Sequence, residues 1–182
     1  MPAPHRPPLT RPPDFSRFWA ATLAELERVP PAVERRRERI EDGILLERLA
    51  FDSLGGARIR GYLLRDESGA RRPLVFHGHG YEDQVEPRWD WAAAGMDVCG
   101  VDVRGVGQSR DALPNPSPWG YVLTGIEAPE SHVLRGAVCD YLRGARIARD
   151  VLGATVERTA LQGFSFAGGL AVLAEAFGRR VS

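Results

Sequence analysis

The sequence GFSFAG at residues 163–168 lies between a short stretch that predicts a strand, 159–162, and a run of small and apolar residues that predicts a helix, 168–177. A serine in a sharp turn between a strand and a helix projects out of the sheet. The N–H of the following residue then lies at the start of the helix. This context predicts that Ser165 is a nucleophile.

Small residues on both sides of Ser165 suit such a turn, because its backbone passes close to neighbouring segments. Gly163 precedes the serine by two positions, and Ala167 and Gly168 follow it. The position of Ala167 usually holds glycine in turns of this kind, and alanine is another small residue. The alternative interpretation is a glycine-rich helix start that only packs or binds phosphate.

The order of the other segments predicts the fold class. Apolar stretches at 73–76 and 97–103 predict short buried strands, and 45–51 with 57–64 predict an antiparallel hairpin whose wet side includes Tyr62. Helices are expected from Asp14 to the prolines at 30 and 31, at 88–94 and at 129–152. We therefore expect an α/β fold with a mostly parallel sheet, an antiparallel hairpin at its start and helices on both faces. The arginine-rich segment 35–39 is interpreted as a charged surface connector.

A second motif, HGHG at residues 77–80, directly follows a predicted strand. Acyl transfer requires two N–H groups aimed at the developing oxyanion, and glycines let a loop backbone approach the reacting atoms. We assign these roles to the backbone N–H groups of His79 and Phe166. The alternative, His77 or His79 as a general base or metal ligand, lacks an obvious supporting carboxylate cluster, so no metal is expected.

A third motif, DVRGVGQS at residues 102–109, follows the predicted strand 97–103. Open α/β sheets build their sites at such strand ends. The interpretation we favour is a structural turn in which Arg104, followed by Gly105, pairs with a nearby carboxylate and supports the site without touching substrate. The long loop 108–128 then forms part of the site wall.

Composition narrows the class of protein. The chain has 24 basic and 24 acidic side chains, so its net charge of zero does not predict nucleic-acid binding. Cys99 and Cys139 lie in apolar segments without metal-ligand spacing, which predicts buried free thiols and a cytoplasmic location. Residues 1–13 hold six prolines and predict an extended lead-in without a signal peptide, and no apolar run is long enough to cross a membrane.

These motifs, in this order, resemble the acetyl xylan esterase / cephalosporin-C deacetylase family of α/β-hydrolases, and the resemblance covers nearly the whole chain. The segment 77–80 stands where that family has His-Gly-Tyr, Arg104 and Gly105 resemble its Arg-Gly-Gln motif, and 120–126 is similar to its Gly-Tyr…Gly-Ile loop. The chain departs from the family at three places. His79 replaces the tyrosine, Val106 replaces a glutamine, and Phe166 with Ala167 replaces Gln-Gly after the nucleophile.

The resemblance implies a cofactor-free carboxylic-ester hydrolase that removes acetyl groups from sugars or small molecules. Its partner would be a small-molecule or carbohydrate ester, and the full-length form could be a homo-oligomer. A backbone oxyanion hole is compatible with the departures because it uses N–H groups and not side chains. Phe166 makes the expected site more apolar than is usual for the family.

The catalytic acid and histidine follow the serine in α/β-hydrolases. Residues 166–182 contain neither His nor Asp, and their one acid, Glu175, is expected on the helix pointing away. The sequence therefore predicts that residues 14–182 are the N-terminal part of a single α/β-hydrolase domain, truncated after the helix that follows Ser165. Two alternatives stay open: an inactive remnant or assembly module, and a peptidase or lactone hydrolase on the same fold.

Overall fold

The computed structural model describes residues 10–81 and 83–178, so most of the proline-rich segment 1–13 lies outside the described residues. The strands are β1 (Glu34–Glu41), β2 (Ile44–Asp52), β3 (Arg58–Asp66), β4 (Arg72–His77), β5 (Asp97–Asp102) and β6 (Val156–Gln162). The helices are α1 (Phe15–Arg28), α2 (Trp89–Ala93), α3 (Val133–Leu152) and α4 (Phe166–Gly178). Short segments of 3-10 helix lie at Leu54–Gly56, Gly107–Ala112, Tyr121–Leu123 and Gly153–Thr155.

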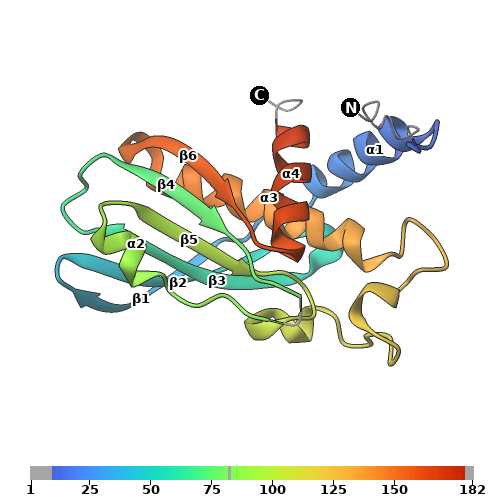
Figure 1. Ribbon diagram of the computed structural model, residues 1–182, viewed down its shortest axis with the longest axis horizontal. Helices are drawn as coiled ribbons and strands as arrows, with labels where there is room; N and C mark the ends of the chain where they lie inside the picture. The colour runs from blue at the N-terminus through green and yellow to red at the C-terminus, as the bar shows by residue number, and fades with distance from the viewer. Residues whose placement is uncertain (1–9, 82, 179–182) are drawn as a thin grey trace, which may run out of the picture.

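The strands form one sheet in the order β1-β2-β3-β5-β4-β6 (Figure 1). The pairs β1–β2, β2–β3 and β3–β5 are antiparallel, whereas β4 is parallel to both β5 and β6. The α/β fold class is therefore confirmed, and the sheet within the described residues is mixed, not mostly parallel. The parallel part places the carboxyl ends of β4, β5 and β6 at one edge of the sheet, where the three motifs follow.

Residues 35–39 were expected to form a charged surface connector, but they belong to strand β1. Every residue of β1 is exposed, but its backbone pairs with β2 from Glu34 opposite Ala50 to Glu41 opposite Ile44. The turn between the two strands is made by Asp42 and Gly43, both with positive φ, as in a tight hairpin. Backbone pairing thus forms this strand without an apolar face.

The prediction that Tyr62 lies on a solvent-exposed face of the hairpin is wrong, because its side chain is completely buried. It belongs to a cluster that includes Leu46, Leu64, Val98 and Ala92 of α2. The short helix α2 covers this face of the sheet, while α1, α3 and α4 pack on the other (Figure 1). Helices therefore cover both faces of the sheet, as is expected for a sheet in the middle of an α/β fold.

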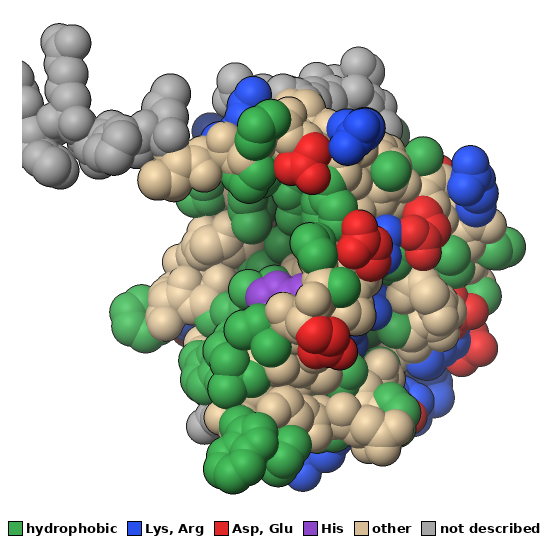
Figure 2. Space-filling model, turned by 90° about the vertical axis from the view of Figure 1, so that its right-hand side faces the viewer, with side chains coloured by type: hydrophobic (Ala, Val, Ile, Leu, Met, Phe, Trp, Pro, Cys, Tyr) green, Lys and Arg blue, Asp and Glu red, His purple; other side chains and the backbone are tan. Residues whose placement is uncertain are grey.

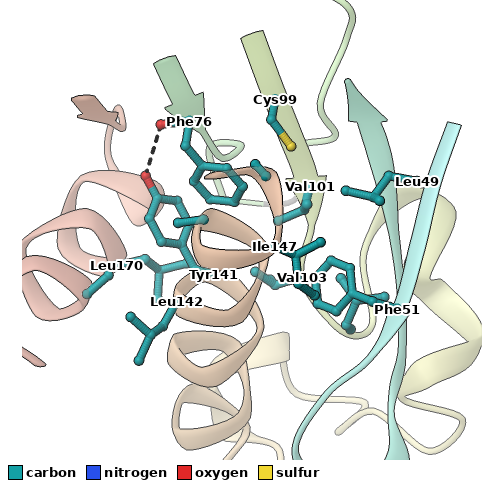
Figure 3. Packing of buried hydrophobic residues seen from close by; sticks show 14 of the residues in the cluster. Leu49, Phe51, Phe76, Cys99, Val101, Val103, Tyr141, Leu142, Ile147 and Leu170 are labelled. Atoms are coloured by element: carbon teal, nitrogen blue, oxygen red, sulfur yellow. Dashed lines mark hydrogen bonds between the residues drawn. The ribbon is translucent and has the colours of Figure 1, made fainter. Parts of the chain in front are cut away.

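The main core lies between the sheet and α3 (Figure 3). Tyr141 of α3 packs edge-on against Phe76 of β4, with the ring centroids 4.8 Å apart, and its hydroxyl donates to the Gln162 carbonyl at 2.9 Å. Full burial of a large apolar side chain contributes about 1.5–3 kcal/mol to stability. Tyr141 therefore joins the ends of β4 and β6, which carry the first two motifs.

Cys99 and Cys139 are free and buried, as predicted, and burial raises the pKa of both thiols. Across residues 10–81 and 83–178, we find no helix with the length and apolar character needed to cross a membrane.

Candidate active site

Ser165 lies in the turn between the end of β6 and the start of α4, and its side chain is exposed. Its φ of 51° falls in the left-handed region, which costs free energy for any residue except glycine. Its carbonyl accepts the N–H of Gly169 at 3.3 Å, which starts the helix. Such a strained serine on a strand–turn–helix unit has the geometry of a nucleophile elbow.

The glycine before the serine is required by close backbone contact. A side chain at Gly163 would place its Cβ 2.2 Å from the carbonyl atoms of Ala167, so no other residue fits without moving the turn. The same atom at Gly168 would lie 3.2 Å from the Gly163 oxygen. Ala167 itself is completely buried. The predicted small residues thus lie where the turn folds back on itself.

The loop after β4 passes beside this turn. A Cβ at Gly78 would lie 3.0 Å from the Ala167 Cβ and 3.1 Å from the Tyr141 ring, so the two segments are in contact. The rings of His79 and Phe166 lie side by side with their centroids 6.0 Å apart and their planes tilted by 39°. The structure therefore brings together the two residues whose N–H groups were predicted to form the oxyanion hole.

The His79 side chain is engaged on both ring nitrogens and is only 4% exposed. The Val103 N–H donates to its Nε2 at 3.3 Å, and its Nδ1 lies 2.7 Å from the Gly80 carbonyl oxygen. Because a carbonyl only accepts, Nδ1 is the donor to Gly80, while Nε2 is the acceptor from Val103. Neither nitrogen is left for a general base or a metal ligand.

His77 lies on the other face of the sheet. The Arg88 N–H donates to the Tyr62 hydroxyl at 3.2 Å, and that hydroxyl lies 2.5 Å from His77 Nε2. Burial lowers the pKa of His77 to about 4, so the ring is a neutral acceptor. No group of three or more His, Cys, Asp or Glu within the described ranges is arranged to hold a metal ion.

Arg104 joins the loop after β5 to α3. Its Nε and Nη2 donate to the Asp140 carboxylate at 2.9 and 2.8 Å, and its backbone N–H donates to the same group at 3.0 Å. Asp140 is completely buried. A side chain at Gly136 would place its Cβ 2.4 Å from the guanidinium, so glycine gives the arginine room. This bidentate pair holds the loop in place, as the structural interpretation of the third motif requires.

Sequence reasoning missed two other groups at this edge. The buried Asp102 accepts N–H groups of Val85 at 2.7 Å and Gln108 at 2.9 Å, and so fastens the two loops that flank the site; its burial raises the pKa of the carboxyl. Tyr81 packs with Tyr121 and Phe166 in an aromatic cluster next to Ser165. The position of Tyr81 directly after the HGHG motif was the only available signal for it.

A pocket of about 530 Å³ opens beside this cluster. Tyr121 contributes to both the aromatic cluster and the pocket wall, whose other members come from the loops after β4 and β5. The face in Figure 2 is hollowed, with a histidine side chain inside the hollow and hydrophobic side chains along its margin. The pocket is lined by Asp83, Gln84, Gly105, Val106, Gly107, Arg110 and Tyr121.

Solved structures of esterases share this architecture. Acetyl xylan esterase 1 from Thermoanaerobacterium sp. JW/SL YS485 aligns with a TM-score of 0.83 and 26% identity over 93% of this chain and 56% of its own. The acetyl xylan esterase from Paenibacillus sp. R4 gives 0.82 and 26%, over 93% of this chain and 57% of its own. A cold-adapted esterase from an Arctic intertidal metagenomic library shares the fold, with a TM-score of 0.54, 16% identity and coverage of 80% and 60%.

The chain spans a little over half the length of the two acetyl xylan esterases that it resembles. The sequence pattern of the acetyl xylan esterase (AXE1) family matches residues 4–182, which is nearly the whole of this chain. The matched region contains the β6–α4 turn, the loop after β4 and the Arg104–Asp140 pair. On the pattern and the shared structure together, this chain belongs to the acetyl xylan esterase family of α/β-hydrolases.

Proposed function

We propose that this chain provides the nucleophile and the oxyanion hole of a carboxylic-ester hydrolase that removes acetyl groups from sugars or small molecules. The observation that carries the proposal is the conformation of Ser165, an exposed serine with φ of 51° between β6 and α4. A fold retains such strain at functional sites, where it presents the reactive group. The contact of Gly78 with Ala167 supports the proposal, because it brings the His79 backbone to the same turn.

In the proposed reaction, Ser165 Oγ attacks the acyl carbon and forms a tetrahedral intermediate. The backbone N–H groups of His79 and Phe166 stabilise the negative oxygen, at a site where each such donor can contribute about 10²–10³ in rate. A general base from outside the described residues takes the proton of the Ser165 hydroxyl during the attack and gives it to the alcohol oxygen as the C–O bond to the alcohol breaks. Water then attacks the acyl-enzyme, which releases acetate and returns a proton to Ser165 Oγ. The engaged ring of His79 has a purely structural part in this scheme, because it holds the loop to β5 through Val103.

A fluorophosphonate probe tests the assignment of the nucleophile. We expect the complete gene product to be labelled at Ser165, and the Ser165→Ala variant to lose the label. Ser68→Ala is the matched control, since Ser68 is an exposed serine in the β3–β4 turn. Labelling that persists in Ser165→Ala, or that is absent from the wild type while a known serine esterase is labelled, would refute the proposal.

A second candidate is a non-catalytic member of the fold. The hydrogen bonds that the described histidines make favour it. His77 and His79 are engaged as above, and His132 Nε2 lies 2.8 Å from the Val122 carbonyl oxygen. Within the described residues, no histidine is hydrogen-bonded to Ser165. Acetate-ester turnover by the 182-residue chain, abolished in Ser165→Ala, would reject this candidate.

The substrate class is a separate question, because a fold hosts many chemistries. A panel of acetyl esters of sugars, simple alkyl acetates, a lactone and a peptide amide distinguishes the deacetylase from a lactone hydrolase or peptidase. We expect turnover of the acetyl esters only. Preferred cleavage of the lactone or the amide would replace the deacetylase proposal with the corresponding activity.

A further inference from the structure

Three aromatic rings meet beside Ser165, and they come from the start of α4 and from the loops after β4 and β5. Phe166 follows the nucleophile, Tyr81 follows the HGHG motif and Tyr121 lies in the long loop after β5. The Phe166 centroid is 5.9 Å from that of Tyr121 and 6.3 Å from that of Tyr81, with interplanar angles of 86° and 83°. The two tyrosines are 6.2 Å apart at 73°. Each ring therefore meets the others edge to face, the arrangement that aromatic quadrupoles favour.

Contacts with neighbouring residues hold the rings of Tyr121 and Phe166 in place. The Tyr121 hydroxyl donates to the Arg104 carbonyl at 2.9 Å, and the ring lies so close to Gly105 that a Cβ there would be 3.1 Å from Tyr121 Cε2. The His79 ring packs on Phe166 with centroids 6.0 Å apart. Tyr81 is 41% exposed, so the cluster reaches solvent at one end and the buried loop at the other. An apolar wall thus extends from Phe166, next to the nucleophile, to Tyr81.

The pocket of about 530 Å³ shares Tyr121 with this wall, and its lining also contains polar residues. Tyr121, Gly105 and Val106 provide the side next to the cluster, whereas Asp83 and Arg110 contribute charged side chains. Pockets of roughly 300–1,000 Å³ accommodate small organic ligands. This volume admits an aromatic ring that packs on Tyr121 and carries a polar substituent within reach of Asp83 or Arg110.

We propose that the cluster of Phe166, Tyr81 and Tyr121 selects acetyl esters whose alcohol is an aromatic ring bearing a polar group, in preference to acetylated sugars. The inference deepens the proposed function and rests on it: since the acyl group there is a small acetyl, the ring belongs to the alcohol. An aryl group can pack a wholly apolar face on these rings, whereas a sugar offers only its smaller C–H face, so the aryl ester removes more apolar surface from water.

The test compares two substrates in the complete gene product: 4-hydroxyphenyl acetate and a monoacetylated methyl xyloside. The quantity measured is the ratio of their kcat/KM values, normalised to the wild type so that the intrinsic reactivity of the two leaving groups cancels. In Phe166→Gln, which keeps the backbone N–H, we expect the normalised ratio to fall by about tenfold, the scale of a lost apolar contact in a pocket. Tyr81→Ala should lower it in the same direction, and Phe166→Tyr should retain it.

Phe164→Gln is the matched control, because Phe164 lies on the opposite side of Ser165 in sequence and is 80% exposed. We expect its normalised ratio to stay within about twofold of the wild type, as for a substitution that leaves the pocket contacts intact. Equal losses on both substrates in Phe166→Gln, or a ratio that rises toward the aryl ester, would overturn the inference while leaving the esterase proposal intact. Turnover of neither substrate, without fluorophosphonate labelling at Ser165, would instead overturn the proposed function and the inference with it.

Discussion

Gly78 of the loop after β4 lies against Ala167 of α4, so closely that a Cβ on Gly78 would be 3.0 Å from the Ala167 Cβ. This contact joins the two segments that carry His79 and Phe166, although they are far apart in sequence. The distance between the two proposed oxyanion donors therefore depends on the absence of a side chain at residue 78.

Gly78→Ala should accordingly reduce both stability and activity. The added methyl group must displace Ala167 or the Tyr141 ring, 3.1 Å away, and overpacking of this kind costs about 1–3 kcal/mol. Urea unfolding measures the loss. Gly169→Ala is the control, since no atom lies within 4 Å of its Cβ position in α4, and alanine there should stabilise the helix by up to about 1 kcal/mol. Equal stability of the two variants would contradict the close contact.

The pair Arg104–Asp140 should be far more sensitive than an exposed pair of the same geometry. Asp140→Asn leaves a buried guanidinium without its charge partner, which costs about 3–5 kcal/mol. Asp111→Asn breaks the bidentate pair with Arg60 at the surface, where such pairs contribute about 0–1 kcal/mol. Chemical denaturation of both variants gives the comparison, and a loss at Asp111 as large as that at Asp140 would argue against the role of burial.

The hydroxyl of Tyr121 should contribute to stability, whereas that of Tyr81 should not. Tyr121→Phe removes a hydrogen bond to the Arg104 carbonyl but keeps the ring, so we expect a loss of about 1 kcal/mol. Tyr81→Phe changes an exposed side chain and should stay within about 0.5 kcal/mol of the wild type. Thermal unfolding by circular dichroism can separate the two, and a reversed order would show that the loop is held in another way.

His77 predicts a pH dependence of stability. Burial lowers its pKa from 6.5 to about 4, so between these values the unfolded chain binds a proton that the folded chain does not. The free energy of unfolding should therefore fall as the pH drops from about 6.5 to 4, by about 1.4 kcal/mol per unit of the pKa difference. Burial raises the pKa of Asp97 and Asp102, whose contributions have the opposite sign at the acid end of this range.

The comparison with His77→Gln isolates the histidine from these carboxylates. We expect the wild type to lose more stability than the variant over that pH range, measured by urea unfolding at each pH. An NMR titration of the His77 ring gives an independent value for the pKa. Parallel stability curves for the two proteins, or a ring that titrates near pH 6.5, would contradict a buried neutral imidazole.

The elements that sequence analysis predicted correctly have a local signal. The apolar runs of β4 and β5 and the small residues around Ser165 are features of single segments, and they identified the strands and the turn before α4. Strand β1 has no apolar alternation because all its residues are exposed, so only the Asp42–Gly43 turn pointed to it. Tyr62 was placed on the wrong side because alternation marks two faces without showing that α2 covers the second.

By itself, the sequence determined the strand–turn–helix around Ser165, since the glycine and alanine there are required by backbone contacts between residues only a few positions apart. Only the tertiary structure decided which loops meet at that turn. The register of β4, with Val75 opposite Ala160 of β6 and Val98 of β5, brings the ends of the strands to one edge and so sets Tyr81 and Tyr121 against Phe166. Contacts between distant segments follow from strand order and packing, which no local pattern encodes.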